Sequence, residues 1–238
     1  MPDLSQRLLK DEILDDLQLK GNELNRTLEE LTKINRLLLN TQTITKEVLN
    51  VISSLETSGE EMTIIDLGCG AGDILIHLAA ELQKRQIRAK LIGIDGNPHS
   101  ISFCREAGKN YSNLRFISED IQDPGFVLPP CDIMISSHFM YHLTESEIIH
   151  FLAKQHAKIK HTIIISELVR HPIAYYLFRL ISPVLGVGDI TYRDGLTAIR
   201  RAYTFEELKR IIDKVNFLQK RHYRFLLFRQ ILVINLDS

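Results

Sequence analysis

The 238-residue chain has few cysteines and no excess of either charge. Its three cysteines, Cys69, Cys104 and Cys131, lie far apart and form no CxxC pair, which argues against a disulfide framework and a structural zinc site. This usage fits a reducing compartment, so we expect a cytoplasmic protein. The formal net charge is -1 and the Lys and Arg residues are scattered, unlike the basic patches that gather phosphates. Nucleic acid is therefore not the expected partner.

A long hydrophobic run is also missing from the start of the chain. Acids interrupt the apolar positions of MPDLSQRLLKDEILDDL, a pattern typical of neither a signal peptide nor a membrane span. From residue 4 to about residue 55, apolar residues recur at helical spacing, and we expect this helix to break or bend near Gly21. This spacing predicts a helical extension over residues 1–58. It either covers one side of the next domain or serves as a lid or a homodimer surface.

The pattern changes after Ser58-Gly59. Short β-rich runs alternate with amphipathic stretches, which predicts a parallel sheet with helices on both faces in one α/β domain over residues 59–238. A capping box from Thr204 to Glu207 predicts a further helix near the end. Strands are expected at 63–67, 90–95, 114–118, 132–136, 162–167, 218–228 and 230–235, and helices at 73–85, 100–109 and 144–157.

Residues 170–203 form a stretch that is too long for a simple connection. An aromatic-rich helix over residues 173–181 is expected to end at Ser182-Pro183. Insertions at the carboxyl ends of parallel strands lie over the binding crevice, so this helical insertion is a candidate cover for an acceptor pocket. A purely structural helix, buried by its aromatic face, is the alternative.

A glycine-rich turn stands between a predicted strand and helix in TIIDLGCGAGDILIHLAAEL. Gly68, Gly70 and Gly72 let the backbone turn tightly and approach a ligand, while the helix start presents unpaired amide donors. Such a turn is typical of a nucleotide-binding cradle. A tight turn with no ligand is the alternative for the glycines alone.

Acidic residues indicate which cofactor this turn holds. Asp66 ends the first strand, and Asp95 ends the second, where a carboxylate can accept both hydroxyls of a ribose. The dinucleotide fingerprint GxGxxG needs a small residue where this chain has Asp73. Acids near the helix N-terminus disfavour a pyrophosphate but favour the sulfonium and ammonium groups of S-adenosylmethionine.

The segments DLGCGAGD, GIDGNP and RFISEDIQD together resemble the class I S-adenosylmethionine-dependent methyltransferases, over roughly residues 63–235. The resemblance implies a three-layer, Rossmann-like, seven-stranded sheet whose last strand is antiparallel. It also implies that the glycines lie close to the methionine part, that Asp95 holds the ribose, and that Asp120 and Ile121 contact the adenine. The full set of expected cofactor-binding residues is Asp66, Gly68, Cys69, Gly70, Gly72, Asp95, Gly96, Asn97, Asp120, Ile121 and Ser136.

Three histidines are candidates for a catalytic base. His138 and His142 follow the fourth strand in ISSHFMYHLTESE, and His171 follows the fifth. If the acceptor is a hydroxyl or phenol, a histidine can remove its proton, with His138 as first choice and His142 as second. Histidines that only pack beside the cofactor are the alternative. A spacing of four occurs in some zinc sites, but no metal is expected because no third ligand is evident.

The sequence therefore predicts an enzyme that methylates a small, partly apolar metabolite, with oxygen as the favoured atom. Enzymes that methylate adenine or glutamine carry an Asn- or Asp-Pro-Pro-Tyr motif after the fourth strand, and this chain has SSHF at those positions. The segments HPIAYY and ITYRDGLTAIRRAYT resemble bacterial methyltransferases of secondary and lipid-like metabolism, some associated with polyketide pathways. Two alternatives stay open: a non-catalytic S-adenosylmethionine-binding protein and an NAD(P)-dependent oxidoreductase.

Overall fold

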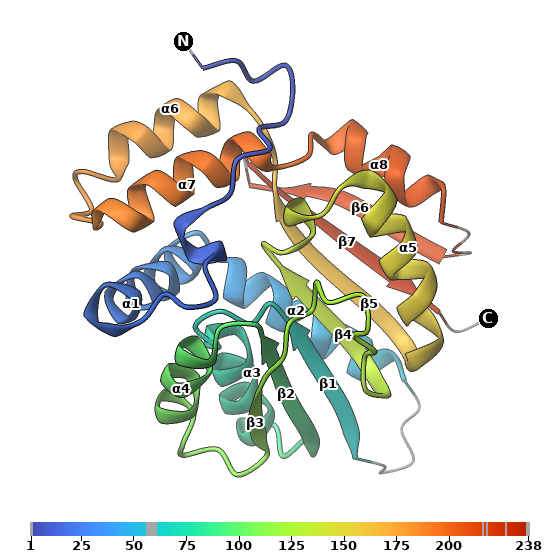
Figure 1. Ribbon diagram of the computed structural model, residues 1–238. Coiled ribbons are helices and arrows are strands. Elements are labelled where there is room, and N and C mark those ends of the chain that lie inside the picture. Colours follow the sequence, from blue (N-terminus) through green and yellow to red (C-terminus); the bar gives the residue numbers. More distant parts are fainter. Residues whose placement is uncertain (1, 56–60, 216, 218, 227, 237–238) are drawn as a thin grey trace.

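The computed structural model describes residues 2–55, 61–215, 217, 219–226 and 228–236. Within these ranges, seven strands form one sheet in the order β3-β2-β1-β4-β5-β7-β6 (Figure 1). β1 to β5 are parallel, and β7 runs antiparallel to β5 and to β6. The bounds are β1 Met62–Leu67, β2 Ala89–Asp95, β3 Leu114–Ser118, β4 Cys131–Ser137, β5 Ile159–Leu168, β6 Gln219–Phe225 and β7 Arg229–Asn235.

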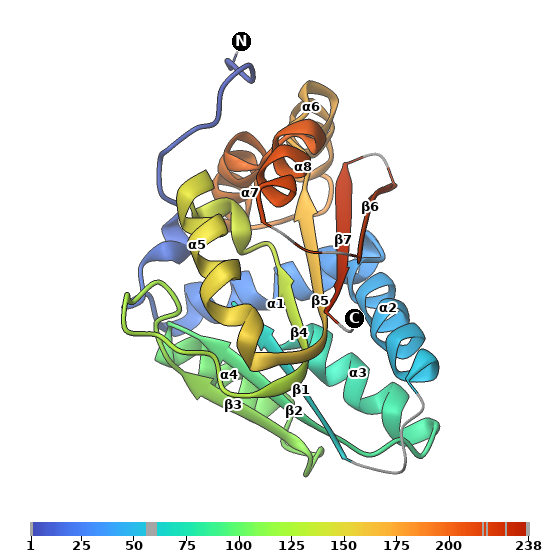
Figure 2. The ribbon, with the colours of Figure 1, turned by 90° about the vertical axis from the view of Figure 1, so that its right-hand side faces the viewer.

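Helices cover both faces of this sheet (Figure 2). Successive residues of a strand point to opposite faces, so Ile65 and Leu67 of β1 pack on one side and Ile64 on the other. The first side holds α5 (Glu145–Gln155) and α8 (Phe205–Asp213); the second holds α2 (Asn40–Ser54), α3 (Asp73–Lys84) and α4 (Pro98–Ala107). This architecture confirms the three-layer, seven-stranded fold with an antiparallel last strand. The predicted boundary at Ser58-Gly59 and the predicted strand start at Leu218 lie outside the described residues.

The N-terminal segment differs from the prediction. Helix α1 (Gly21–Leu37) begins only at Gly21, and residues 4–20 form no α-helix and include one 3-10 turn, Ile13–Asp15. The backbone donors of Ile13 and Leu14 bond to the Asp194 carboxylate at 2.8 and 2.9 Å. Because tertiary partners take these donors, residues 4–20 are an extended covering segment instead of the expected helix. A second break separates α1 from α2, where Leu39 has a φ of 57°.

The insertion holds two helices, α6 (Pro172–Ile181) and α7 (Asp189–Arg201), where one was predicted (Figure 1). Gly195 lies inside α7, and glycine lowers helix propensity by about 1 kcal/mol, so the local sequence pattern did not predict this helix. A Cβ at Gly195 would lie 2.3 Å from the Phe178 ring. The glycine thus permits close packing of α6 on α7. Across the described residues, we find no helix with the length and apolar character needed to cross a bilayer.

Candidate active site

A cavity of about 460 Å³ opens at the carboxyl ends of β1, β2 and β4. The chain leaves β1 toward β2 on one side and later adds β4 on the other side, so the cavity lies where the strand order reverses. Ligands of open α/β sheets bind at this point. The wall combines the turn after β1, the ends of β2 and β4, the N-terminal segment, α1 and the α6–α7 insertion.

The glycine-rich turn forms one end of the cavity. Gly68, Gly70 and Gly72 have φ values of 69°, 51° and 71°, a left-handed conformation that glycine adopts without strain. A Cβ at Gly68 would lie 3.1 Å from Phe139, and one at Gly72 would lie 2.8 Å from Phe116, whereas Gly70 has open space before it. Gly68, Cys69 and Gly70 line the cavity, while Gly72 lies outside the wall and serves close packing.

Asp95 fixes this turn from the end of β2. One carboxylate oxygen accepts from the Gly70 N–H at 2.9 Å, and the other accepts from the Asn97 N–H at 3.0 Å. Asp95 also lines the cavity, beside Gly96, Asp120 and Ile121. The residues predicted for the ribose and the adenine therefore gather at one end.

Three other predicted cofactor residues, Asp66, Asn97 and Ser136, also lie outside the cavity wall. Asn97 instead caps α4, accepting from the His99 N–H at 2.8 Å, and its amide donates to the Leu19 carbonyl at 3.0 Å. Ser136 is fully buried without a partner for its hydroxyl. Its neighbour Ser137 lines the cavity, because successive strand residues face opposite ways.

Asp66 is buried beneath the turn, and neither carboxylate oxygen has a hydrogen-bond partner. Burial, followed by the charges of Asp73 and Asp95, raises the pKa of Asp66 well above its usual range. Burial also raises the pKa of Asp73 and of Asp95. Three carboxyl groups thus crowd the glycine turn. A ligand with positive charge fits this end because it would offset their repulsion, whereas a pyrophosphate would add to it.

His138 also lines the cavity, but its ring is already engaged. Nε2 lies 2.6 Å from Nη1 of Arg229, which donates to the neutral imidazole. Burial, followed by the Arg229 charge, lowers the pKa of His138 well below its usual range. The backbone is left-handed here, with a φ of 56°. This environment disfavours the sequence-based first choice of base, since the accepting nitrogen faces a guanidinium.

His142 has a different environment, which the N-terminal segment provides. Its Nδ1 lies 3.1 Å from Oδ1 of Asp15, and its ring stacks on Tyr141 with centroids 4.3 Å apart. Contacts with His142, then with Arg201, hold the pKa of Asp15 below its usual range although burial opposes them. An acid beside a histidine fixes the ring and stabilises its protonated form. Sequence reasoning missed Asp15 because no motif surrounds it.

Glu12 is the second acid that this segment brings to the cavity. Its side chain is 7% exposed, Oε2 accepts from the Tyr141 hydroxyl at 3.1 Å, and Oε1 has no hydrogen-bond partner. Burial, followed by the Asp15 charge, raises the pKa of Glu12 well above its usual range. Glu12, Asp15 and His142 offer metal-type ligand atoms within 4.8 Å of one another. The Arg201 guanidinium, 2.5 Å from Asp15, already supplies a cation to this cluster.

His171 does not belong to the cavity wall. It is exposed at the start of α6, where Nδ1 accepts from the Ile173 N–H at 3.2 Å, and its ring lies 5.9 Å from that of Phe228. The first residues after β5 lead the chain away from the cavity before α6 returns to it. The geometry therefore does not support the predicted role of His171 as a base.

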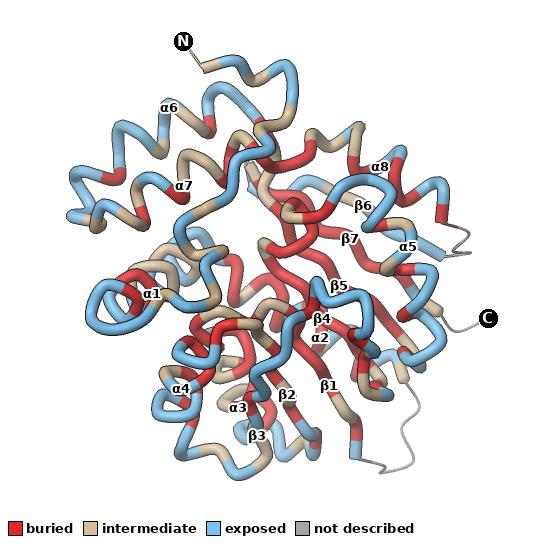
Figure 3. Tube along the Cα trace, in the orientation of Figure 1, coloured by how far each residue is buried: buried red, intermediate tan, exposed pale blue. Residues whose placement is uncertain are grey.

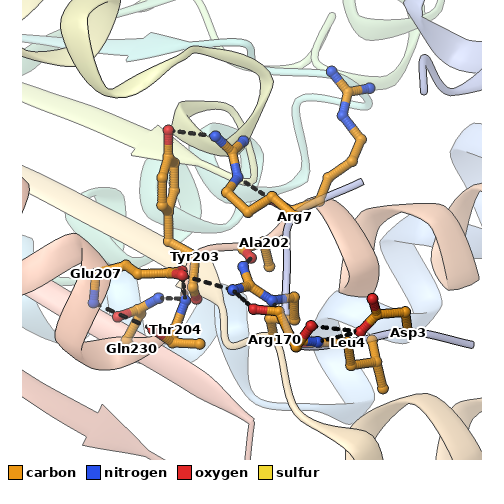
Figure 4. Close-up of polar contacts among 11 residues, drawn as sticks. Asp3, Leu4, Arg7, Arg170, Ala202, Tyr203, Thr204, Glu207 and Gln230 are labelled. Carbon is orange, nitrogen blue, oxygen red and sulfur yellow. Dashed lines mark hydrogen bonds and ion pairs between the residues drawn. The ribbon is translucent and has the colours of Figure 1, made fainter. Parts of the chain in front are cut away.

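Arg170 fastens the N-terminal segment over the site (Figure 4). The buried guanidinium donates to the Leu4 carbonyl at 3.0 Å, to the Ala202 carbonyl at 2.7 Å and to Glu207 at 2.6 Å. Arg7 adds a second tie, because its Nε donates to the Arg201 carbonyl at 2.6 Å. Arg170 is thus fully occupied by the protein itself.

Comparisons with known proteins agree with this geometry. A family model described as a methyltransferase domain matches residues 58–182, just over half of the chain. In sequence, no curated protein matches.

Solved structures share the fold at low sequence identity. An S-adenosylmethionine-dependent methyltransferase from Aquifex aeolicus has 16% identity and a TM-score of 0.60, with 92% of this chain and 100% of that one covered. The plantazolicin methyltransferase BamL, in complex with a triazolic desmethylPZN analog and S-adenosylhomocysteine, has 14% identity and a TM-score of 0.64, with 88% and 90% covered.

Two carbon-methyltransferase structures are longer than this chain. The citrinin polyketide synthase CMeT domain has 12% identity and a TM-score of 0.61, with 82% of this chain covered. This chain spans 51% of that structure and 54% of the CurJ carbon methyltransferase. The family match, together with the glycine turn and its acids, identifies the chain as a member of the class I, S-adenosylmethionine-dependent methyltransferases.

Proposed function

We propose that the protein transfers a methyl group from S-adenosylmethionine to an oxygen atom of a small, partly apolar metabolite. The supporting observation is one cavity whose wall includes both the glycine turn with Asp95 and the His142–Asp15 pair. The cofactor supplies an electrophilic methyl group on a sulfonium. The protein then has to hold both reactants in line, which is worth roughly 7–11 kcal/mol in well-oriented cases.

Oxygen is favoured because the groups around the acceptor end accept protons. His142 is the base in this proposal, with Asp15 orienting its ring and stabilising the charge it gains. Glu12 adds an oxygen, Oε1, that has no hydrogen-bond partner and lies 3.7 Å from Nη1 of Arg201; it can accept a hydrogen bond from the acceptor hydroxyl. The apolar side chains of α1, α6 and α7 keep water from this end. The three free, buried cysteines fit the proposed cytoplasmic location.

Calorimetric titration with S-adenosylmethionine, S-adenosylhomocysteine and NADH tests the cofactor. We expect the first two ligands to bind and NADH not to bind, with Asp95→Ala losing affinity and the exposed control Glu29→Ala keeping it. Binding of NADH alone would overturn the proposal in favour of an oxidoreductase. Formation of S-adenosylhomocysteine with a panel of phenols, alcohols, amines and activated methylenes then tests the reaction. Product only with amines or methylenes would exclude oxygen, and cofactor binding without any product would indicate a binding protein.

A further inference from the structure

Exposed apolar side chains concentrate beside the cavity. Among the described residues, fifteen large hydrophobic side chains are exposed, and ten of them fall in residues 37–39 and 173–185. The first group is the turn between α1 and α2, and the second comprises α6 and the loop after it. Figure 3 shows exposed residues along much of α6. Concentrations of this kind mark binding surfaces more often than scattered single residues do.

Five of these side chains belong to the cavity as well as to the surface. They are between 38% and 63% exposed, yet each lines the cavity. The cavity therefore reaches solvent between α6 and the α1–α2 turn, through an apolar rim that consists of Leu37, Leu38, Leu177, Ile181 and Leu185.

Most side chains that α1, α6 and α7 contribute to the wall beyond this rim are apolar. Leu31 and Ile34 of α1 face the cavity from one side, and Phe178 of α6 and Ile199 of α7 from the other. Polar side chains of this wall include Asn35 of α1, Thr191 and Asp194 of α7, and the group formed by Glu12, Asp15 and His142. A ligand that fills this space needs a polar group at one end and an apolar body that extends to the surface.

We propose that the acceptor is an amphipathic molecule with an extended alkyl or acyl chain, which lies along this wall and leaves through the apolar rim. The proposal rests on the proposed function, since the polar end of such a molecule is the group that is methylated. The continuity between the rim and the interior wall favours a ligand chain over a second protein copy, which would cover the rim without entering the cavity. Burial of the chain would tighten binding by about fourfold for each methylene group.

A homologous series of 4-alkylphenols with ethyl, butyl, hexyl and octyl chains tests this proposal. Each phenol is titrated into the protein saturated with S-adenosylhomocysteine, below its aggregation concentration. We expect Kd to fall steeply with chain length in the natural protein. The double variant Leu177→Gln and Leu185→Gln should weaken octylphenol binding by more than tenfold, with ethylphenol changed by less than threefold. The control Val127→Gln alters an exposed apolar residue that is not part of the rim, and it should retain the full dependence of Kd on chain length.

Each outcome has a distinct meaning. Normal S-adenosylhomocysteine affinity in every variant shows that the fold and the cofactor end are intact. If the natural protein does not bind S-adenosylhomocysteine, the proposed function itself is refuted. With the cofactor end intact, a Kd independent of chain length overturns the inference about the alkyl chain. Light scattering tests the competing occupant. A dimer that the rim variant dissociates would assign the rim to a second copy of the chain and overturn the proposal.

Discussion

Glu167 at the end of β5 is expected to make the stability of the protein depend on pH. Its Oε1 accepts from the backbone N–H groups of Phe139 and Met140 at 3.1 and 2.9 Å, and Oε2 has no partner. Burial raises the pKa of Glu167 to about 7 from 4.5, although the two backbone donors and Arg229 oppose this rise. The folded state therefore keeps a proton that the unfolded state releases. Stability is lost as the pH rises through the range from 4.5 to about 7.

The magnitude follows from the difference between the two pKa values. At about 1.4 kcal/mol for each pKa unit, ionisation of Glu167 costs the folded state about 3 kcal/mol above neutral pH. Glu167→Gln removes the ionisation and keeps an oxygen for the two backbone donors. We expect the variant to match the natural protein in free energy of unfolding near pH 5, and to exceed it by about 3 kcal/mol near pH 8.

Urea denaturation followed by circular dichroism, at several pH values between about 5 and 8, measures this difference. The control is Glu29→Gln, which changes an exposed glutamate on α1. Its free energy of unfolding should change with pH in the same way as that of the natural protein. Parallel curves for Glu167→Gln as well would show that Glu167 is already ionised in the folded state. That result would refute the reasoning from its burial.

Three further predictions concern the turn, the acceptor end and the N-terminal segment. Gly68→Ala should reduce S-adenosylhomocysteine affinity and lower the melting temperature, because the added Cβ would lie 3.1 Å from Phe139 at a φ of 69°; unchanged calorimetry would contradict this. Once an acceptor is known, His142→Gln should lower kcat by roughly 100-fold with cofactor affinity unchanged, and a larger loss in His138→Gln would reverse the assignment. Arg170→Met should destabilise the fold by about 3 kcal/mol and speed proteolysis before residue 20, and equal digestion rates would argue against the tie.

The sequence was informative where structure is set by neighbouring residues. The strand, the glycine turn and the helix after it lie within about twenty residues, and Asp95 follows the next strand at the same sheet edge. The positions of these strands could be predicted because most residues of β1, β2 and β4 are apolar and buried. The cofactor end of the cavity could therefore be predicted from local patterns and the rule that parallel strands end together.

The acceptor end could not be predicted in this way. Asp15 reaches His142 from a segment whose hydrophobic spacing suggested a helix, and its actual course depends on Asp194 in a distant helix. The engagement of His138 depends on Arg229, which arrives from β7. Helix α7 was missed because Gly195 weakens its local signal. All three features depend on contacts between residues far apart in the sequence.

The route of residues 4–20 also has a consequence for the order of folding. The bond from Ile13 to Asp194 spans 181 positions, and the bond from Arg7 to Arg201 spans 194. During synthesis this segment emerges before strands β1 to β5, and its partners on α7 are translated only after those five strands. Contacts of such separation carry a large loop-closure cost and form late. We expect a nascent chain to acquire its cofactor end first, and to become selective for an acceptor only in the last step of folding.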